Sequence, residues 1–472
     1  MIMKTQTITE LSAIDILKGI KKNDFKISEV VEAHISKIEE INPKLNAMAF
    51  PLYEQAREKA QELDNKSNNN GKDKKQPLLG LPVTVKDHVQ VKGGISTFGL
   101  KGLAGNVNQT NSTIVQRLED AGAIVLGCSN MAEFGGAYET DNLIYGRTNN
   151  PYNLNRTSGG SSGGESALIS AQGSPLGIGT DAGGSIRVPA HYTGIVGIKP
   201  TRGRVPLTGI LPETNGMISF LAYVSPMARY VDDVEFVYHQ LIGSDGKDPR
   251  SITYPLESSQ KIDIKKIKVA YYTGFEGIVE IDSDTSKTIN NVVDALKKDT
   301  HSVEEINPIF LEKAYSTWFT LFSGGGGSMP TKFALEQFFN TTEYGIVLQK
   351  LFVEMDKPEN IVSLTDFQLF LMQWDIIAKQ LNGVFQQADI IISPVTISAA
   401  PLHGTTYDSI SDFVYTQIHN LSGLPTLVVR CGTSKEGLPI GVQITANMYR
   451  EDICFAVGKH LENIFEGYKA PK

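Results

Sequence analysis

Short runs of β-branched residues recur along this 472-residue chain, and segments long enough for helices lie between several of them. The runs are residues 82–85, 123–126, 195–198, 267–272, 389–392, 426–429 and 442–445, and the helix-length segments are 111–120, 285–298 and 366–386. Strands that alternate with helices pack as layers, with helices covering a parallel or mixed sheet. The pattern therefore predicts an α/β fold.

The region before the first strand predicts helices and a loop. Apolar residues recur at helical spacing between residues 10 and 42, and the polar turn 21–26 divides them into an antiparallel helix pair that clasps the main body. The low-complexity stretch 64–77, DNKSNNNGKDKKQP, predicts a mobile surface loop. Because the strand pattern resumes directly after it, we expect a single domain, residues 1–472, with a helical segment at 8–63 and a core at 78–240 and 262–472.

Composition excludes several classes of protein. The net charge is -8 and no basic stripe is present, so we expect no nucleic-acid partner. Cys128, Cys431 and Cys454 lack the paired spacing of a zinc site or a disulfide framework, which indicates a reducing compartment. The start of the chain is too polar for a signal peptide, and no apolar run approaches the roughly 18 residues of a membrane span. We expect a soluble, cytoplasmic protein.

Residues 157–167, TSGGSSGGESA, place two serines between two glycine pairs. Such a segment suits a flexible linker, a phosphate-binding loop or the seat of a reacting serine. Residues 159–163 fit the nucleophile elbow G-x-S-x-G, but a polar loop precedes them where the elbow needs a strand. Residues 177–182 fit the dinucleotide pattern G-x-G-x-x-A, but Pro189 soon follows, where a long helix would have to run. Both matches are expected to be accidental.

A second glycine pair with a serine follows at 183–185, with the serine 24 residues after Ser161. Successive backbone N–H groups at 180–185 could converge as in an oxyanion hole. A reacting serine also needs a base, and His191, the nearest histidine, has no acidic partner close in sequence, although triads assemble in space. Lys86 closes a strand-like run, and a buried lysine can become a neutral base. Taken alone, Lys86 also fits an ordinary surface lysine.

These residues resemble the amidase signature family of serine hydrolases. The resemblance covers nearly the whole chain, and its core is the run 159–201, GGSSGGESALISAQGSPLGIGTDAGGSIRVPAHYTGIVGIKPT. Glu165 and the run GSPLGIGTDAGGSIR are most similar to the fatty acid amide hydrolases of the family. The resemblance implies a three-layer α/β/α fold with a large twisted mixed β-sheet.

The resemblance also implies a Ser-Ser-Lys triad, with Ser185 as nucleophile, Ser161 as the bridging serine after a cis peptide bond, and Lys86 as base. Neutral Lys86 would accept the proton of Ser161, which accepts that of Ser185, and the same relay reversed would protonate the leaving nitrogen. Water would then hydrolyse the acyl-enzyme, with no metal or organic cofactor. The implied oxyanion donors are the N–H groups of Ala182, Gly183, Gly184 and Ser185, and the implied supporting residues are Ser162, Asp181 and Arg187.

One branch of the family fits less well. In the glutaminyl-tRNA amidotransferases, an Asp-Gln pair precedes the SPMAR-like segment, whereas residues 219–224, SFLAYV, are apolar at the matching places. This departure favours an apolar acyl or aryl group. Residues that could line a pocket for it, or could simply form helix core, are Phe319, Phe322, Phe333, Phe338, Phe339, Leu348, Leu351, Phe352, Phe367, Leu369, Phe370 and Trp374.

The expected function is hydrolysis of small-molecule amides with apolar or fatty acyl groups, as in lipid metabolism. The alternatives are a non-catalytic binding protein and one component of a tRNA amidotransferase.

Animal fatty acid amide hydrolases carry an N-terminal span, not seen here, and a membrane-inserting cap. The candidate cap, residues 344–355, is short and carries Lys350 and Glu354, so peripheral membrane contact is left open, as is a homodimer. We also expect the glycine run 323–328 to let two backbone segments approach closely.

Overall fold

The computed structural model describes residues 8–67, 76–213, 216–275 and 279–472. Most of the loop predicted at 64–77 lies outside these residues. Its first four residues instead continue the helix α4 (Tyr53–Ser67), four residues beyond the predicted end at residue 63.

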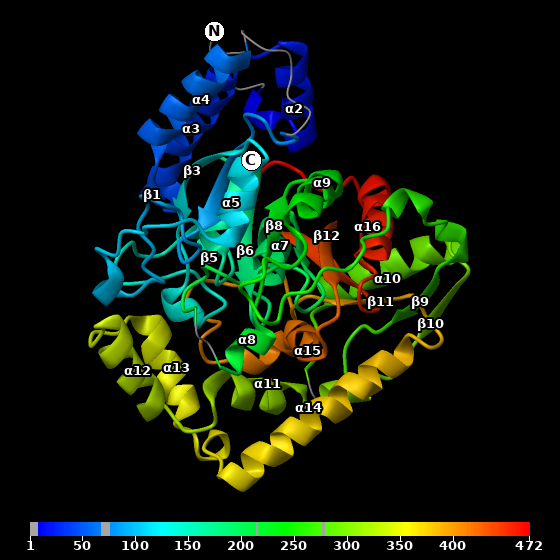
Figure 1. Ribbon diagram of the computed structural model, residues 1–472. Coiled ribbons are helices and arrows are strands. Elements are labelled where there is room, and N and C mark those ends of the chain that lie inside the picture. The colour runs from blue at the N-terminus through cyan, green and yellow to red at the C-terminus, as the bar shows by residue number, and fades with distance from the viewer. Residues whose placement is uncertain (1–7, 68–75, 214–215, 276–278) are drawn as a thin grey trace.

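An 11-stranded mixed sheet forms the centre of the described part of the chain (Figure 1). Across the sheet its strands are β1 (Met48–Pro51), β3 (Ile124–Ser129), β2 (Pro82–Lys86), β6 (Leu176–Asp181), β8 (Tyr223–Ala228), β7 (Val196–Lys199), β12 (Thr426–Thr433), β13 (Pro439–Ala446), β11 (Ile390–Pro394), β9 (Lys268–Tyr271) and β10 (Ser302–Glu305). The β3-β2-β6 and β11-β9-β10 pairings are parallel, and the others are antiparallel. All seven predicted strands are present, which confirms the α/β prediction.

Side chains that alternate along the strands separate two apolar layers, as the period of a strand requires. On β8, Ala228 joins the core beneath one set of helices, and Met227 joins a cluster on the opposite face. The first set comprises α5 (Thr113–Asp120), α9 (Val231–Leu241), α10 (Ser283–Asp299) and α16 (Glu451–Phe465). The opposite face holds α6 (Gly163–Ser170) and α7 (Arg187–Thr193), in which every residue is buried. The three-layer α/β/α arrangement is therefore confirmed.

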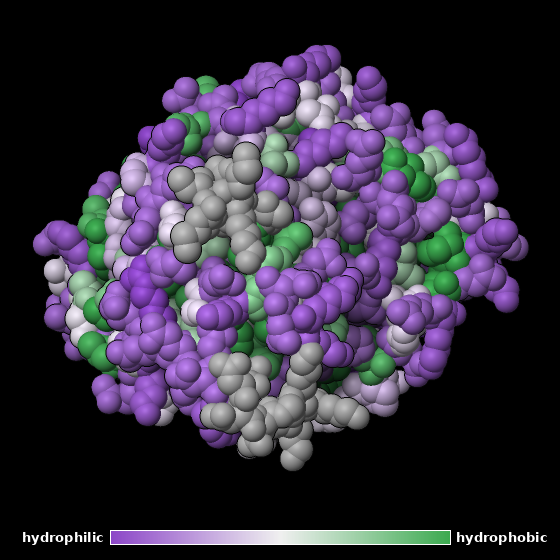
Figure 2. Space-filling view, turned by 90° about the horizontal axis from the view of Figure 1, so that it is seen from above, coloured by the Kyte–Doolittle hydropathy of each residue, from purple (hydrophilic) through white to green (hydrophobic). Residues whose placement is uncertain are grey.

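The N-terminal helices α2 (Ala13–Lys22) and α3 (Ile27–Leu45) lie with α4 at one end of the molecule. The carboxylate of Asp233 on α9 accepts the N–H groups of Ala13 and Ile14, at 3.0 and 2.9 Å, at the start of α2. These bonds satisfy amide groups that have no partner inside the helix. Seen from above, this end of the molecule is mainly hydrophilic, and hydrophobic residues form only small groups on it (Figure 2).

A second group of helices lies at the opposite end, coloured green to orange in Figure 1. It consists of α8 (Ile218–Leu221), α11 (Ala314–Ser323), α12 (Met329–Phe339), α13 (Ile346–Met355), α14 (Leu364–Val384) and α15 (Val414–Ser422). The glycine run 323–328 makes the expected close approach, because Val362 N donates to Gly325 O at 2.9 Å and Gly326 bridges to Ile361. Among the described residues, no helix is both long and apolar enough to cross a bilayer.

Candidate active site

Lys86 ends β2, which lies between β3 and β6 in the sheet, and its side chain is fully buried. Its Nζ lies 2.7 Å from Ser161 Oγ and 2.9 Å from Thr180 Oγ1. Burial lowers the pKa of Lys86 to about 7, although the carboxylates of Asp181 and Glu165 act in the opposite direction. A lysine in this position can therefore lose its proton near neutral pH and act as a base, and it is not a surface lysine.

Ser161 lies two residues before the start of α6, and the peptide bond that joins it to Gly160 is cis. A Cβ atom at position 160 would lie 2.6 Å from both Ala137 O and Glu139 N, so only glycine fits there. The preceding strand, β5 (Asn153–Thr157), pairs with β4 (Asn149–Asn150) in a separate two-stranded sheet and does not belong to the main sheet. The segment is therefore not a nucleophile elbow, which needs a strand of the central sheet at that point.

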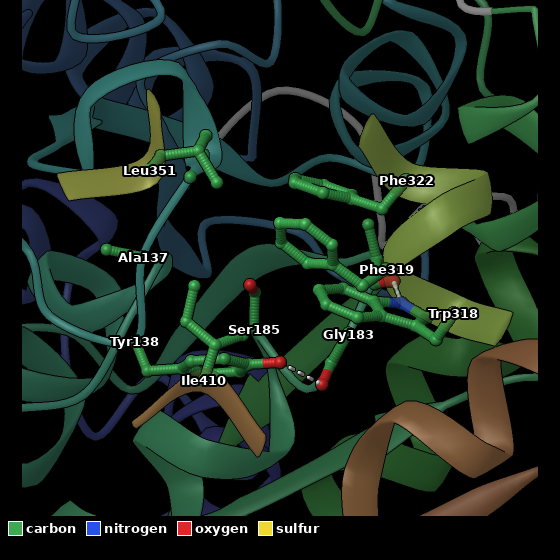
Figure 3. A pocket seen from close by; sticks show the side chains of 12 residues that line it. Ala137, Tyr138, Gly183, Ser185, Trp318, Phe319, Phe322, Leu351 and Ile410 are labelled. Carbon is green, nitrogen blue, oxygen red and sulfur yellow. Dashed lines mark hydrogen bonds between the residues drawn. The ribbon is translucent and has the colours of Figure 1, made fainter. Parts of the chain in front are cut away.

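Ser185 lies in the turn between β6 and α7, and its hydroxyl points into a small cavity (Figure 3). The two serine segments are joined through the backbone, because Ser162 N donates to Ser185 O at 3.3 Å and Ser162 Oγ donates to Thr180 O at 3.1 Å. Within the described residues the Ser185 hydroxyl makes no hydrogen bond, so Ser185 and Ser161 are not hydrogen-bonded through their hydroxyls in this structure. Catalytic hydrogen bonds often tighten only when substrate binds.

Side chains from other parts of the chain hold the turn 182–185 in place by donating hydrogen bonds to its carbonyl groups. The indole N–H of Trp318 donates to Ala182 O at 2.8 Å, and the hydroxyls of Tyr138 and Thr416 donate to Gly183 O at 3.0 and 2.7 Å. Figure 3 shows the contact of Tyr138 beside Ser185. Because the C=O and N–H of one trans peptide group lie in the same plane and point in opposite directions, fixing a carbonyl also fixes the N–H of the next residue.

One of the four predicted oxyanion donors is already engaged. The Gly184 N–H donates to Asp181 Oδ1 at 2.8 Å, and this carboxylate competes with any substrate oxygen for the same hydrogen. Within the described residues, the N–H groups of Ala182, Gly183 and Ser185 have no acceptor. Ala182, Gly183 and Ser185 also line the cavity, so their N–H groups are the ones placed to meet a substrate oxygen, and the oxyanion role of all four residues stays a prediction.

Glu165, which the sequence marked only as a point of family resemblance, lies on the same side of the sheet as Lys86. Its carboxylate accepts hydrogen bonds from the hydroxyls of Thr84 and Ser129, the latter at 2.5 Å. Burial raises the pKa of Glu165 to about 7. A Cβ atom at Gly177 would meet Glu165 Oε1 at 1.8 Å, so this glycine makes room for the carboxyl group and does not belong to a dinucleotide-binding turn.

His191 is excluded as the base of the serine. Its Nδ1 accepts the N–H of Gly441 at 2.7 Å, and its Nε2 bonds to Ser398 O at 3.0 Å. Burial lowers the pKa of His191 to about 4. Both ring nitrogens are occupied by backbone groups, so its role is structural.

The cavity in front of Ser185 is narrow and largely apolar. It encloses about 30 Å³, room for one or two water molecules. Its lining residues are Gly135, Gly136, Ala137, Tyr138, Ala182, Gly183, Ser185, Trp318, Phe319, Phe322, Leu351 and Ile410. Of the apolar residues suggested from sequence, only Phe319, Phe322 and Leu351 line it, whereas Phe333 and Phe338 are 62% and 74% exposed.

Comparison with known proteins adds to this geometry. Residues 29–455 match the family model described as Amidase. The chain is 30% identical over 495 residues to fatty-acid amide hydrolase 2 of Homo sapiens, covering 99% of this chain and 91% of that protein. It is 29% identical over 499 residues to a glutamyl-tRNA(Gln) amidotransferase component of Lachnoclostridium phytofermentans, covering 98% and 99%. The solved structure of a bacterial aryl acylamidase superposes with a TM-score of 0.86 at 25% identity, covering 98% of each chain.

Proposed function

The chain belongs to the amidase signature family, and on that premise we propose that it hydrolyses carboxylic amides through an acyl-Ser185 intermediate. The observation that carries the proposal is the 2.7 Å contact between Lys86 Nζ and Ser161 Oγ inside a fully buried site. A buried lysine with a lowered pKa beside a serine hydroxyl is equipped to accept a proton. A non-catalytic binding protein would have no need of a buried lysine that can accept a proton.

The first half of the reaction forms the acyl-enzyme. Ser185 Oγ attacks the amide carbonyl carbon as its proton passes to Ser161 and the proton of Ser161 passes to Lys86. The negative charge that develops on the carbonyl oxygen is met by the N–H groups of Ala182, Gly183 and Ser185. When the carbon–nitrogen bond breaks, Ser161 protonates the leaving nitrogen and recovers a proton from Lys86.

The second half releases the acid. A water molecule takes the place of the amine, gives its proton to the same relay and attacks the acyl carbon. The carbon–oxygen bond to Ser185 then breaks, and the proton returns to Ser185 Oγ. Each group is left in its starting protonation state, so the balance of the reaction is amide and water to acid and amine.

We propose that the acyl group is apolar. Aromatic and aliphatic side chains line the cavity at Ser185, and Trp318 and Phe322 stack there with ring centroids 4.9 Å apart. Apolar walls favour alkyl or aryl groups because burying them releases hydrophobic free energy. The small volume favours short acyl or flat aryl groups unless these aromatic side chains move aside, and a fatty acyl chain would require that movement.

The amidotransferase reading is the second candidate, supported by the similarity to the tRNA-dependent enzyme. At the position where those enzymes are expected to carry an Asp-Gln pair, the present chain has apolar residues, and Leu221 is fully buried in an apolar cluster. The Leu221 side chain cannot hydrogen-bond a carboxamide as the side chains of an Asp-Gln pair could. The structure therefore gives more support to an independent amidase.

Membrane contact stays a prediction. The candidate cap corresponds to α13, and both of its charged residues have partners: Lys350 pairs with Asp408 at 2.7 Å, and Glu354 accepts from the hydroxyl of Tyr315 at 2.8 Å. Apolar side chains such as Phe338 on the neighbouring α12 are exposed. A lipid surface could receive them, but so could a second copy of the chain.

A fluorophosphonate probe tests the proposal directly. The wild type should be labelled at one residue and should hydrolyse aryl and alkyl amides as an isolated chain. Ser185→Ala should lose both properties, while Ser283→Ala, an exposed serine at the start of α10, should keep both. Labelling that survives Ser185→Ala would exclude Ser185 as nucleophile. Activity only toward glutaminyl or asparaginyl amides, and only with a partner chain, would support the amidotransferase reading.

A further inference from the structure

We infer that His88, acting through the hydroxyl of Thr180, is a positioning residue that keeps the lone pair of Lys86 directed at Ser161. The inference rests on the proposed function, because it concerns the same proton relay. It follows from the direction of three consecutive hydrogen bonds, each of which fixes the next.

The first bond fixes the tautomer of His88. Its Nδ1 lies 2.7 Å from the carbonyl oxygen of Leu211, and a carbonyl oxygen can only accept. Nδ1 therefore carries the hydrogen. Burial and the neighbouring Lys86 charge hold the pKa of His88 well below its usual value, so the ring has one N–H only and its Nε2 is an acceptor. The ring is also fixed in place by stacking on Phe98, with centroids 5.1 Å apart and planes 3° from parallel.

The second bond fixes the hydroxyl of Thr180. Its Oγ1 lies 2.7 Å from His88 Nε2, which can only accept, so the single hydroxyl hydrogen of Thr180 points at the imidazole. Its lone pairs then face the other partner, Lys86 Nζ, at 2.9 Å. Toward Lys86, Thr180 can act only as an acceptor.

The third bond fixes Lys86. A neutral amine has two hydrogens and one lone pair, and Thr180 takes one of the hydrogens. The lone pair is then available to Ser161 Oγ at 2.7 Å, in the direction that the relay needs. Without His88, the Thr180 hydroxyl could rotate and donate to Lys86, and that arrangement would occupy the lone pair that must accept the proton of Ser161.

His88 acts by fixing the direction of the Thr180 hydroxyl hydrogen and not by contributing a charge. The charged groups that face Lys86 are Asp87 on its own segment, Asp181 from β6 and Glu165 from α6. All three stay in place when His88 is replaced. A change of the pH profile in a His88 variant would therefore report on the hydrogen bonds of Thr180 and Lys86.

The test is a double-mutant cycle on amide hydrolysis. His88→Phe keeps a flat ring against Phe98 but removes the acceptor, and should lower kcat by about 10- to 100-fold, part of the 10²–10⁴ that a general base supplies, with KM little changed. His88→Gln offers a carbonyl acceptor in place of Nε2 and should restore most of kcat. Thr180→Val removes the rotating hydroxyl, so adding His88→Phe to it should cost less than about twofold more, as expected for residues that act through one another.

The pH profile distinguishes positioning from packing. In His88→Phe, Thr180 can stabilise neutral Lys86, so the acidic limb of kcat/KM should move to lower pH while the plateau falls. Thermal unfolding and active-site titration with the fluorophosphonate show that each variant is folded and count its reactive sites. Wild-type kcat in His88→Phe, or losses that add in full in the double variant, would overturn the inference and leave the proposed function intact. A wild type that neither hydrolyses amides nor reacts with the probe would overturn both.

Discussion

Asp181 and Arg187 form a bidentate ion pair in which neither side chain reaches solvent, with Nε–Oδ2 and Nη2–Oδ1 distances of 3.0 Å. The pair spans the turn that carries Ser185. The same carboxylate accepts the N–H groups of Gly184 and Ile186, and Arg187 also bonds to Thr416 O. Burial alone would raise the pKa of Asp181, but the charge and hydrogen bonds of Arg187 outweigh it and hold that pKa well below its usual range. The conformation of the turn that carries Ser185 therefore depends on this pair.

Arg187→Met should destabilise the protein strongly. It leaves the Asp181 carboxylate buried without its cation, and breaking a buried pair in this way costs about 3–5 kcal/mol. Arg57→Met is the matched control, because Arg57 pairs with Glu32 at a partly exposed surface where such pairs contribute at most about 1 kcal/mol. Urea unfolding of both variants measures the difference. Equal losses of unfolding free energy would show that the buried pair does not stabilise the turn.

The rate should rise with pH through the neutral range. The proposed base works only when neutral, and burial lowers the pKa of Lys86 to about 7. Below that value kcat/KM should fall about tenfold per pH unit as Lys86 becomes protonated, and above about pH 8 it should level off. Lys86→Ala should lower kcat by about 10²–10⁴-fold. Lys92 is exposed, so Lys92→Ala should keep the wild-type kcat. A profile that is flat between pH 5 and 9 would contradict the assignment of Lys86 as base.

Glu165→Gln should make the enzyme work at lower pH. The Glu165 carboxylate raises the pKa of Lys86, opposing the larger effect of burial. Glutamine has nearly the same shape and can still bond to Thr84 and Ser129, but it carries no charge. The pKa of Lys86 should fall, which increases the fraction of neutral lysine at acidic pH. The acidic limb of kcat/KM should therefore move to lower pH. A limb that stays in place would mean that Glu165 is uncharged in the free enzyme, since its own pKa lies at about 7.

Sequence alone predicted those parts of the molecule that follow from local pattern. The period of the β-branched runs placed β2 and β12, and the spacing of Ser161 and Ser185 pointed to the segments around the site. The features that the sequence did not predict depend on contacts that sequence pattern does not record. Nothing near Gly184 in the sequence shows that its N–H turns back to Asp181, and the link from His88 to Leu211 joins positions 123 residues apart.

For the same reason, the sequence did not show which of the apolar residues line the cavity. Phenylalanines in the helical segments have similar sequence surroundings, yet Phe322 faces the cavity and Phe333 faces solvent. Helical spacing shows which residues share a face of one helix but not which face meets another helix. The orientation of α11 and α12 is set by tertiary packing, which the sequence pattern does not record.

Phe322→Ala should shift the preference toward longer acyl groups. Phe322 lines the narrow cavity at Ser185, and removing its ring opens space next to the acyl carbon. Each methylene that finds an apolar place contributes about 0.8 kcal/mol, or roughly fourfold in kcat/KM. A series of anilides from acetyl to octanoyl should therefore show a steeper rise with chain length in Phe322→Ala than in the wild type. Phe333→Ala, which removes an equal ring that is 62% exposed, should leave the series unchanged. If both variants follow the wild-type series, the acyl group binds elsewhere than in the cavity of Phe322.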